Sequence, residues 1–94
     1  MEALQDQAAE AFRDGKASEA IRFTVEALEL QRKEDLFPLY SQQYENLARI
    51  YWAVGDWKMS TKYARMSLDL LKEQGYIEGY NEQHLAMLLK SFDR

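Results

Sequence analysis

The stretch YENLARIYWAVGDWKMSTKYARMSLDLL, from Tyr44 to Leu71, decides the fold of this chain. On both sides of its Gly55-Asp56 pair the apolar residues recur at the three- and four-residue spacing of one helix face. Glycine tolerates the left-handed conformation that ends a helix, and aspartate is a favoured cap at the start of the next. The stretch therefore predicts two amphipathic helices joined by a tight turn.

An earlier stretch, Ala8 to Leu30, repeats the second part of this pattern. Placing Gly15 on Gly55 gives an offset of 55 − 15 = 40 residues between the two copies. Small residues then recur where large ones would keep helices apart, so we expect close helix contacts there. The aligned pairs are Ala8 with Ala48, Ala20 with Ser60, Ala27 with Ser67, and the larger Leu28 with Leu68.

This ordered set resembles the tetratricopeptide (TPR) superfamily, whose helix-turn-helix repeat is about 34 residues long. The first copy, AFRDGKASEAIRFTVEALEL, has the family's glycine at the turn and its alanines at helix contacts. In the second copy, four residues stand where the family places its Trp, Leu, Gly and Tyr: Tyr44, Leu47, Ala48 and Tyr51. The longer offset is similar to that of the long-repeat branch, which resembles spindle-orientation adaptors and kinesin light chains.

The resemblance implies an all-α fold of antiparallel helical hairpins in a single domain, residues 1–94. Repeat 1 is expected at about 3–33, repeat 2 at about 36–74, and a terminal capping helix at about 81–92. Asp35 is expected to cap the third helix, with Pro38 in its first turn, and Asn81 to cap the last. Periodicity gives the helices themselves: Ala3–Arg13, Ala17–Lys33, Leu36–Val54, Trp57–Gln74 and Asn81–Phe92.

The same periodicity predicts which faces are buried. On the third helix the apolar stripe is Tyr40, Tyr44, Leu47, Ala48, Tyr51 and Val54. On the fourth it is Trp57, Ser60, Ala64, Leu68 and Leu71. The last helix carries Leu85, Leu88, Leu89 and Phe92 on one side, a face too apolar for water, so we expect it to cover the preceding hairpin.

Composition narrows the classes of partner. The 94 residues carry a net charge of −4 with both signs interspersed, which argues against nucleic acid or an anionic membrane as partner. The chain contains no cysteine, so disulfides and thiol chemistry are excluded. No apolar run approaches the roughly 18 residues of a membrane span, and the start of the chain is unlike a signal peptide. We expect an intracellular protein, cytoplasmic or nuclear.

Groups that could support catalysis do not converge in the sequence. The single histidine, His84, has only Glu82 nearby, whereas a metal site needs several ligands at suitable spacing. No glycine-rich phosphate loop, serine-centred elbow or metalloprotease helix is present. We therefore predict a protein that is not an enzyme and has no cofactor and no metal.

The partner-binding surface is inferred from the resemblance, which implies that the first helix of each repeat lines a concave face. There Trp52 would offer apolar area and Arg49 would grip a carboxylate, unless Trp52 and Phe12 instead pack across the interior. The Lys and Asn clamp typical of chaperone-tail binders is missing, which argues against that ligand. The expected concave residues are Glu2, Gln5, Ala9, Phe12, Arg13, Gln42, Glu45, Arg49, Trp52 and Asp56.

These observations predict a non-catalytic interaction or scaffolding module that binds a protein, as a peptide or partner helix, in its concave face. Self-association into a homo-oligomer is an alternative, because about three repeats are usually needed for independent stability. The second copy is also similar to the TPR-like C-terminal region of SET-domain lysine methyltransferases, which would make the chain a structural lobe of a larger enzyme. Irregularities such as Phe37-Pro38 argue against a designed repeat.

Overall fold

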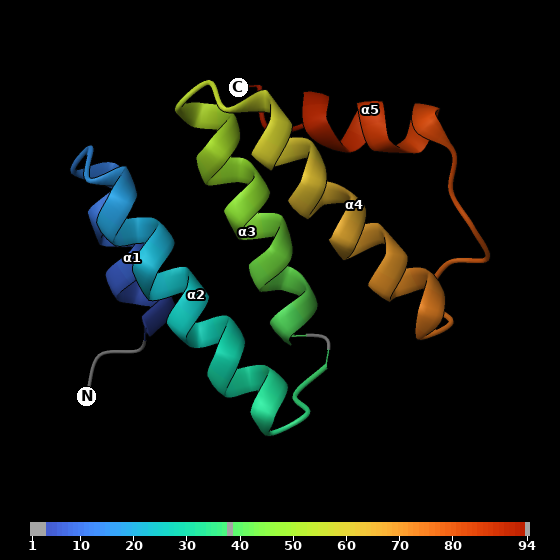
Figure 1. The fold of residues 1–94 in the computed structure, drawn as a ribbon, viewed down its shortest axis with the longest axis horizontal. Coiled ribbons are helices and arrows are strands. Elements are labelled where there is room, and N and C mark those ends of the chain that lie inside the picture. Colours follow the sequence, from blue (N-terminus) through green and yellow to red (C-terminus); the bar gives the residue numbers. More distant parts are fainter. Residues whose placement is uncertain (1–3, 38, 94) are drawn as a thin grey trace.

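The computed structural model describes residues 4–37 and 39–93, and the chain forms five α-helices within these ranges. Consecutive helices run in alternating directions from α1 to α4, and α5 lies across the end of the last pair (Figure 1). No strand occurs in the described ranges, so the all-α prediction is confirmed. The helices are α1 (Leu4–Arg13), α2 (Ala17–Lys33), α3 (Leu39–Ala53), α4 (Trp57–Glu73) and α5 (Glu82–Lys90).

The start of α3 differs from the prediction. Asp35 does not cap this helix, because its backbone is left-handed, with φ 56°, and it closes α2 instead. The next residue, Leu36, donates its N–H to the carbonyl oxygen of Gln31 at 2.8 Å. Asp35 and Leu36 therefore close the end of α2, and α3 begins at Leu39, with the Tyr40 N–H donating to the carbonyl oxygen of Leu36 at 3.3 Å. The expected place of Pro38 in the first turn lies outside the described residues.

The ends of α1 to α4 share one geometry. Positive φ angles occur at positions 15, 35, 55 and 75, each 20 residues after the one before. At each position the N–H bonds to the carbonyl oxygen three residues back, and the following N–H bonds to the one five residues back. This is the Schellman pattern, which satisfies carbonyls that a helix end leaves unpaired. Asp35 therefore stands where the other three ends have glycine, and the 40-residue offset comprises two 20-residue halves.

The helix α3 contributes to all three clusters of the core. Its Leu47, fully buried, packs with Tyr44 and with Leu28 of α2. Its Ile50 belongs with Ala11 and Ala20, which come from the first hairpin. Its Ala48 contacts the cluster of Ala64 from α4 and Leu85 from α5. The hydrophobic core is therefore built around one helix that packs against α2, α4 and α5.

Small residues lie where the helices approach most closely, as the two copies predicted. Ala20, Ala27, Ser60 and Ser67 are all buried. In the second hairpin the two serines of α4 also form hydrogen bonds to the backbone of α3. Ser60 Oγ donates to the carbonyl oxygen of Ala48 at 2.8 Å, and Ser67 Oγ donates to that of Ser41 at 3.4 Å. A buried hydroxyl needs such a hydrogen-bond partner. The serines are therefore small enough for close helix packing and have their hydroxyl groups paired.

Some residues predicted to be buried are not. Val54 is 53% exposed and Trp57 is 55% exposed, because both flank the turn at the end of the hairpin. Leu68 and Leu71 are only half-buried. The reason is that α4 meets α3 through its small residues, so Ser67 takes the inward position and Leu68 lies to the side, against the cluster that contains Leu85.

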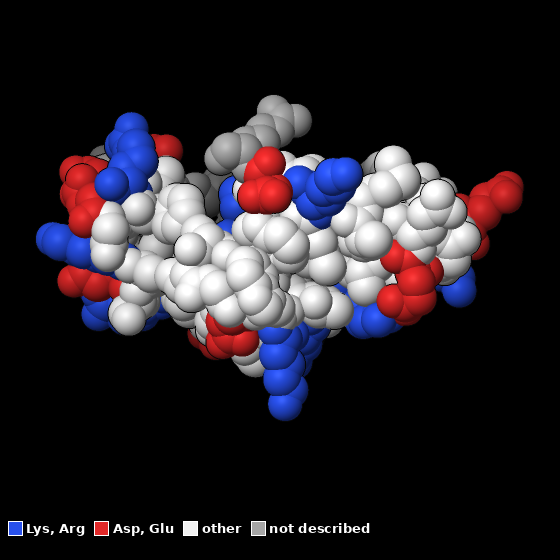
Figure 2. Space-filling model, turned by 90° about the horizontal axis from the view of Figure 1, so that it is seen from above, with Lys and Arg blue, Asp and Glu red and all other residues white. Residues whose placement is uncertain are grey.

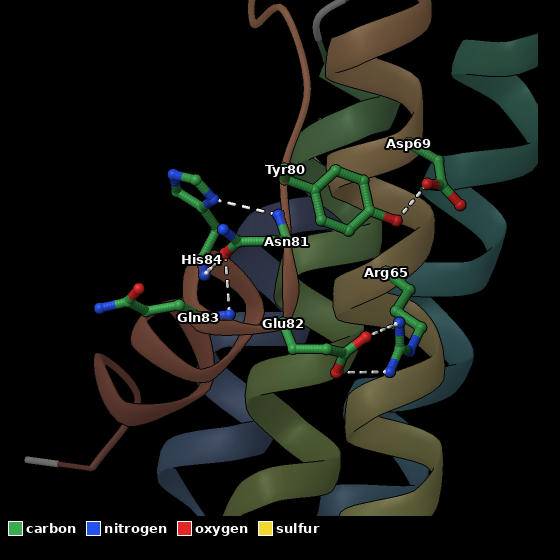
Figure 3. Close-up of polar contacts among 7 residues, drawn as sticks. All are labelled: Arg65, Asp69, Tyr80, Asn81, Glu82, Gln83 and His84. Carbon is green, nitrogen blue, oxygen red and sulfur yellow. Dashed lines mark hydrogen bonds and ion pairs between the residues drawn. The ribbon is translucent and has the colours of Figure 1, made fainter.

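The terminal helix α5 covers the last hairpin as predicted, with Leu85 only 3% exposed and Leu88, Leu89 and Phe92 half-buried. Figure 3 shows the polar contacts at its start. Arg65 of α4 binds both carboxylate oxygens of Glu82, at 2.8 and 2.9 Å. The Tyr80 hydroxyl, in the connector, donates to the Asp69 carboxylate.

The predicted cap of α5 is confirmed. Asn81 Oδ1 accepts the N–H groups of Gln83 and His84, at 2.9 and 3.2 Å. His84 Nδ1 accepts the Asn81 N–H at 3.1 Å, so histidine takes the place that glutamate or glutamine usually has in a capping box. The single histidine of the chain therefore serves the helix end.

The contacts at the start of α5 predict how stability depends on pH. The hydrogen bond from Arg65 lowers the pKa of Glu82 in the folded state. The ionised Glu82 therefore stabilises the fold at pH values above the pKa of an unfolded glutamate, roughly 4.3, and this stabilisation is lost as pH falls through the lower folded pKa. The hydrogen bond to Asp69 raises the pKa of Tyr80, so that contribution is present below about pH 10 and is lost as pH rises through the higher folded value. Stability from this cluster should therefore be greatest between these limits.

The measurement is urea unfolding at several pH values for the wild type, Glu82→Gln and Tyr80→Phe. The difference in free energy of unfolding between the wild type and Glu82→Gln should shrink from about pH 7 to about pH 3. The corresponding difference between the wild type and Tyr80→Phe should close above about pH 10. Glu78→Gln serves as the control, since it removes a connector carboxylate that makes no ion pair within the described ranges. Gaps that do not vary with pH would contradict the assignment.

Candidate functional site

A pocket of about 160 Å³ lies between α1 and α3, with one residue of α2 in its lining. We call it the α1–α3 pocket. Its volume is close to that of a roughly 150 Å³ apolar cavity that binds benzene, so it has room for one apolar side chain. Its lining residues are Gln5, Ala8, Ala9 and Phe12 from α1, Thr24 from α2, and Gln43, Asn46, Arg49 and Ile50 from α3.

Most of the apolar lining comes from α1. Ala8 and Ile50 are buried, Phe12 is half-buried and Ala9 is exposed at the opening. The space exists because α1 presents alanines to the pocket, and a methyl group cannot fill the gap that a longer side chain would. Phe12 also packs on the core cluster of the first hairpin, which holds its ring in place.

Three of the polar lining residues form a row on α3, each three residues from the next, which we call the α3 polar row: Gln43, Asn46 and Arg49. Arg49 Nη1 donates to Asn46 Oδ1 at 3.3 Å, and Asn46 Nδ2 donates to Gln43 Oε1 at 3.2 Å. Gln43 is only 1% exposed. Its Nε2 group has no hydrogen-bond partner among the residues that the structure describes. The row therefore ends on a buried donor that is unpaired.

Arg49 is held from a second side by Phe92, which lies two residues beyond the end of α5. Its guanidinium lies over the ring of Phe92, 5.2 Å from the centroid. Such a cation–π contact stabilises the charge and restricts the plane of the guanidinium. No carboxylate lies within ion-pairing distance of Arg49 in the described part of the chain. Arg49 is exposed, so this positive charge is accessible at the edge of the pocket.

Four of the predicted concave residues line the pocket together: Gln5, Ala9, Phe12 and Arg49. Arg13 is exposed at the end of α1, beside a shallow depression that it shares with Asp6, Ala9, Glu10 and Phe12. Glu2 lies outside the described residues.

The other predicted residues do not line the pocket. Gln42 is exposed and Glu45 half-buried on α3. Asp56 caps α4, where its carboxylate accepts the Met59 N–H at 3.1 Å. Their roles in binding stay predictions.

Trp52 is half-buried in an aromatic cluster rather than open on a concave wall. Its ring centroid lies 4.5 Å from that of Trp57 and 6.4 Å from that of Phe92, edge to face in both cases. Trp52 therefore packs against these two rings, and its role in binding stays a prediction. The cluster joins the end of α3 to the start of α4 and to Phe92, which lies two residues beyond α5 and also contacts Arg49.

The sequence analysis missed Gln43, Asn46, Ile50, Thr24 and Ala8 as pocket residues. The available signal was the spacing of polar residues at 43, 46 and 49, which puts three of them on one side of a helix. Polar groups on a side that also carries buried residues are more informative than polar groups on a solvated face.

Charges elsewhere do not suggest a different kind of site. Figure 2 shows Lys and Arg interspersed with Asp and Glu on the side in view, and neither sign forms a continuous patch there. In the described ranges, no group of three His, Cys, Asp or Glu side chains is arranged to hold a metal. None of the five helices combines the length and apolar character needed to cross a bilayer.

No protein-family model matches the chain, and searches of curated proteins and of solved structures find no match.

Proposed function

We propose that this chain is a non-catalytic protein-interaction module of TPR-like helical hairpins, which binds a peptide or partner helix in the α1–α3 pocket. The observation that carries the proposal is an apolar pocket with a polar side, formed by the first helices of the two hairpins. Binding sites for small groups are usually concave and mostly apolar, with a few polar groups that set orientation. The α1–α3 pocket has this composition.

The position of the pocket supports the TPR-like interpretation. The two copies of the sequence pattern place α1 and α3 at equivalent positions, 40 residues apart, and both contribute to the pocket. The equivalent small residues are buried at helix contacts in both hairpins. A ligand bound there would touch both repeats, as expected for a groove that a repeat array forms.

The test is selection of binding peptides from a displayed random-peptide library, using the wild type and two matched variants. Ala9→Trp fills the opening of the pocket from an exposed position on α1. Ala86→Trp makes the same change at an exposed position on α5 outside the pocket lining. The proposal expects peptides that bind the wild type and Ala86→Trp but lose about tenfold or more in affinity for Ala9→Trp, about 1.4 kcal/mol.

Failure to enrich any peptide, or equal binding to Ala9→Trp, would overturn the proposal. Circular dichroism of both variants checks that helicity is retained, so that loss of binding is not loss of fold.

Self-association is a second candidate function, favoured by apolar side chains at the other end of the hairpins. Phe37 lies 5.1 Å from Tyr76 and 5.7 Å from Tyr40, between ring centroids. Tyr76 is 64% exposed, and Leu36 and Leu39 are 39% and 42% exposed. Light scattering over a range of concentrations decides this point: a mass that rises with concentration and falls for Tyr76→Glu supports self-association. A monomer would leave this surface for a neighbouring domain, as in a lobe of a larger enzyme.

A further inference from the structure

We infer that the ligand of the α1–α3 pocket is an acidic peptide segment, with an apolar side chain that enters the pocket, a carboxylate that binds Arg49 at the pocket edge, and an acceptor that pairs with the NH₂ group of Gln43. The inference rests on the proposed function and specifies the chemistry of its ligand. Two observations carry it: the direction of the hydrogen bonds in the α3 polar row, and an unpaired buried donor at its end.

Arg49 determines that direction. A guanidinium can only donate, so Asn46 must turn its oxygen toward Arg49 and its NH₂ group toward Gln43. Gln43 must then turn its oxygen toward Asn46, which leaves its own NH₂ group pointing away from the row. The usual ambiguity in the orientation of amide side chains is thereby removed. The groups left free at the two ends of the row, the other N–H groups of Arg49 and the NH₂ group of Gln43, are donors.

The unpaired donor is buried, which makes it informative. Gln43 is 1% exposed and lines the pocket, and no described residue accepts from its Nε2. Buried donors are nearly always paired, because leaving one unpaired loses its hydration without replacement. The other polar group in this part of the lining, the Thr24 hydroxyl, is paired with the carbonyl oxygen of Ala20 at 2.7 Å. The Gln43 donor is thus the one that an acceptor from a ligand would complete.

The charge at the edge of the pocket indicates that the ligand also carries a carboxylate, which pairs with Arg49. Arg49 makes no ion pair with a described carboxylate, and its single hydrogen bond to Asn46 leaves further N–H groups free. The planar guanidinium matches a carboxylate with two parallel hydrogen bonds. Since most of the remaining lining is apolar and the pocket has room for one side chain, the ligand combines an apolar residue with an adjacent Asp, Glu or terminal carboxylate.

The test uses the peptides that lose binding to Ala9→Trp, synthesised in matched pairs with each carboxylate either present or replaced by its amide. The amide form should bind the wild type about tenfold or more weakly, since hydrogen bonds to charged groups are about twice as strong as neutral ones. Arg49→Gln should weaken the acidic peptides by a similar factor and should no longer distinguish the two forms. Because half of this comparison changes only the peptide, it holds even if a protein variant is poorly folded.

The role of Gln43 is tested with Gln43→Met, which keeps the length of the side chain and removes the donor. Gln83→Met, at an exposed position on α5 outside the pocket lining, is the matched control. We expect weaker binding of the acidic peptides for Gln43→Met and unchanged binding for Gln83→Met. If Gln43 were only structural, Gln43→Met would unfold more easily without a specific effect on the acidic form.

The results separate this inference from the function on which it rests. Peptides that depend on the pocket but bind equally well as acids and amides would overturn the inference and leave the proposed function standing. If no peptide is sensitive to Ala9→Trp, the proposed function fails and the inference fails with it.

Discussion

Leu47→Ala is expected to lower the free energy of unfolding by about 2–5 kcal/mol, as truncation of a buried leucine typically does. Leu47 is fully buried at the centre of α3 and packs with Leu28 and Tyr44. The alanine would lose apolar contacts and leave a cavity between α2 and α3. In a chain of 94 residues, where total stability is about 5–15 kcal/mol, the change removes a large share of it.

Urea unfolding followed by circular dichroism measures the effect, with Leu39→Ala as the matched control. Leu39 begins the same helix and is 42% exposed, so its truncation should cost clearly less. Equal losses for the two variants would contradict the placement of Leu47 at the centre of the core.

Ala48→Leu is expected to destabilise the fold by overpacking, at about 1–3 kcal/mol. Ala48 is fully buried, and it packs in one cluster with Ala64 of α4 and Leu85 of α5. A leucine there would push α4 away from α3 and break the bond from Ser60 Oγ to the Ala48 carbonyl, which is 2.8 Å long. Stranding that buried hydroxyl would add about 1–3 kcal/mol.

The control is Ala53→Leu, the same substitution at an exposed position on the same helix. It should change the free energy of unfolding by no more than about 0.5 kcal/mol, as surface substitutions usually do. A second comparison, Ser60→Ala in the Ala48→Leu background, should recover the part of the loss due to the hydroxyl. If Ala48→Leu were as stable as Ala53→Leu, the close packing of α3 on α4 would be wrong.

Helix boundaries could be predicted well where local chemistry decides them. The ends at Gly15, Gly55 and Gly75 and the caps at Asp56 and Asn81 depend on neighbours in the chain, and the structure has them as expected. The exception is Asp35. Aspartate is a residue type that favours the N-cap of a helix, yet Asp35 has the left-handed backbone of a helix C-terminus. Aspartate serves both roles, and the sequence does not say which helix it belongs to.

Burial was predicted less well, because periodicity gives the face of a helix and not how far along that face its neighbours extend. Val54 and Trp57 follow the apolar pattern, yet they lie at the end of a hairpin where no other helix reaches far enough to bury them. Leu68 was displaced from the centre by Ser67, because a small residue permits the closest approach of two helices. Such preferences depend on the partner helix.

The candidate site likewise contains some residues that the sequence could predict and some that it could not. Gln5, Phe12 and Arg49 could be proposed from their place on the first helices of the two copies. Gln43 and Asn46 could not, because buried amides are ordinarily structural and only the hydrogen-bond pattern shows that one donor is unpaired. Phe92 lies 43 residues beyond Arg49 in the chain (92 − 49), and only the return of α5 across the hairpin brings their side chains together.

By itself, the sequence determined that the chain is helical, where most helices begin and end, and which small residues lie at helix contacts. These properties follow from backbone preferences, capping and periodicity, all of which act within a few residues. Only the tertiary structure decided which polar side chains meet at the α1–α3 pocket, which donor stays unpaired and how Phe92, just beyond α5, holds Arg49. The physical reason is that packing and hydrogen bonding between helices depend on distances that no local rule sets.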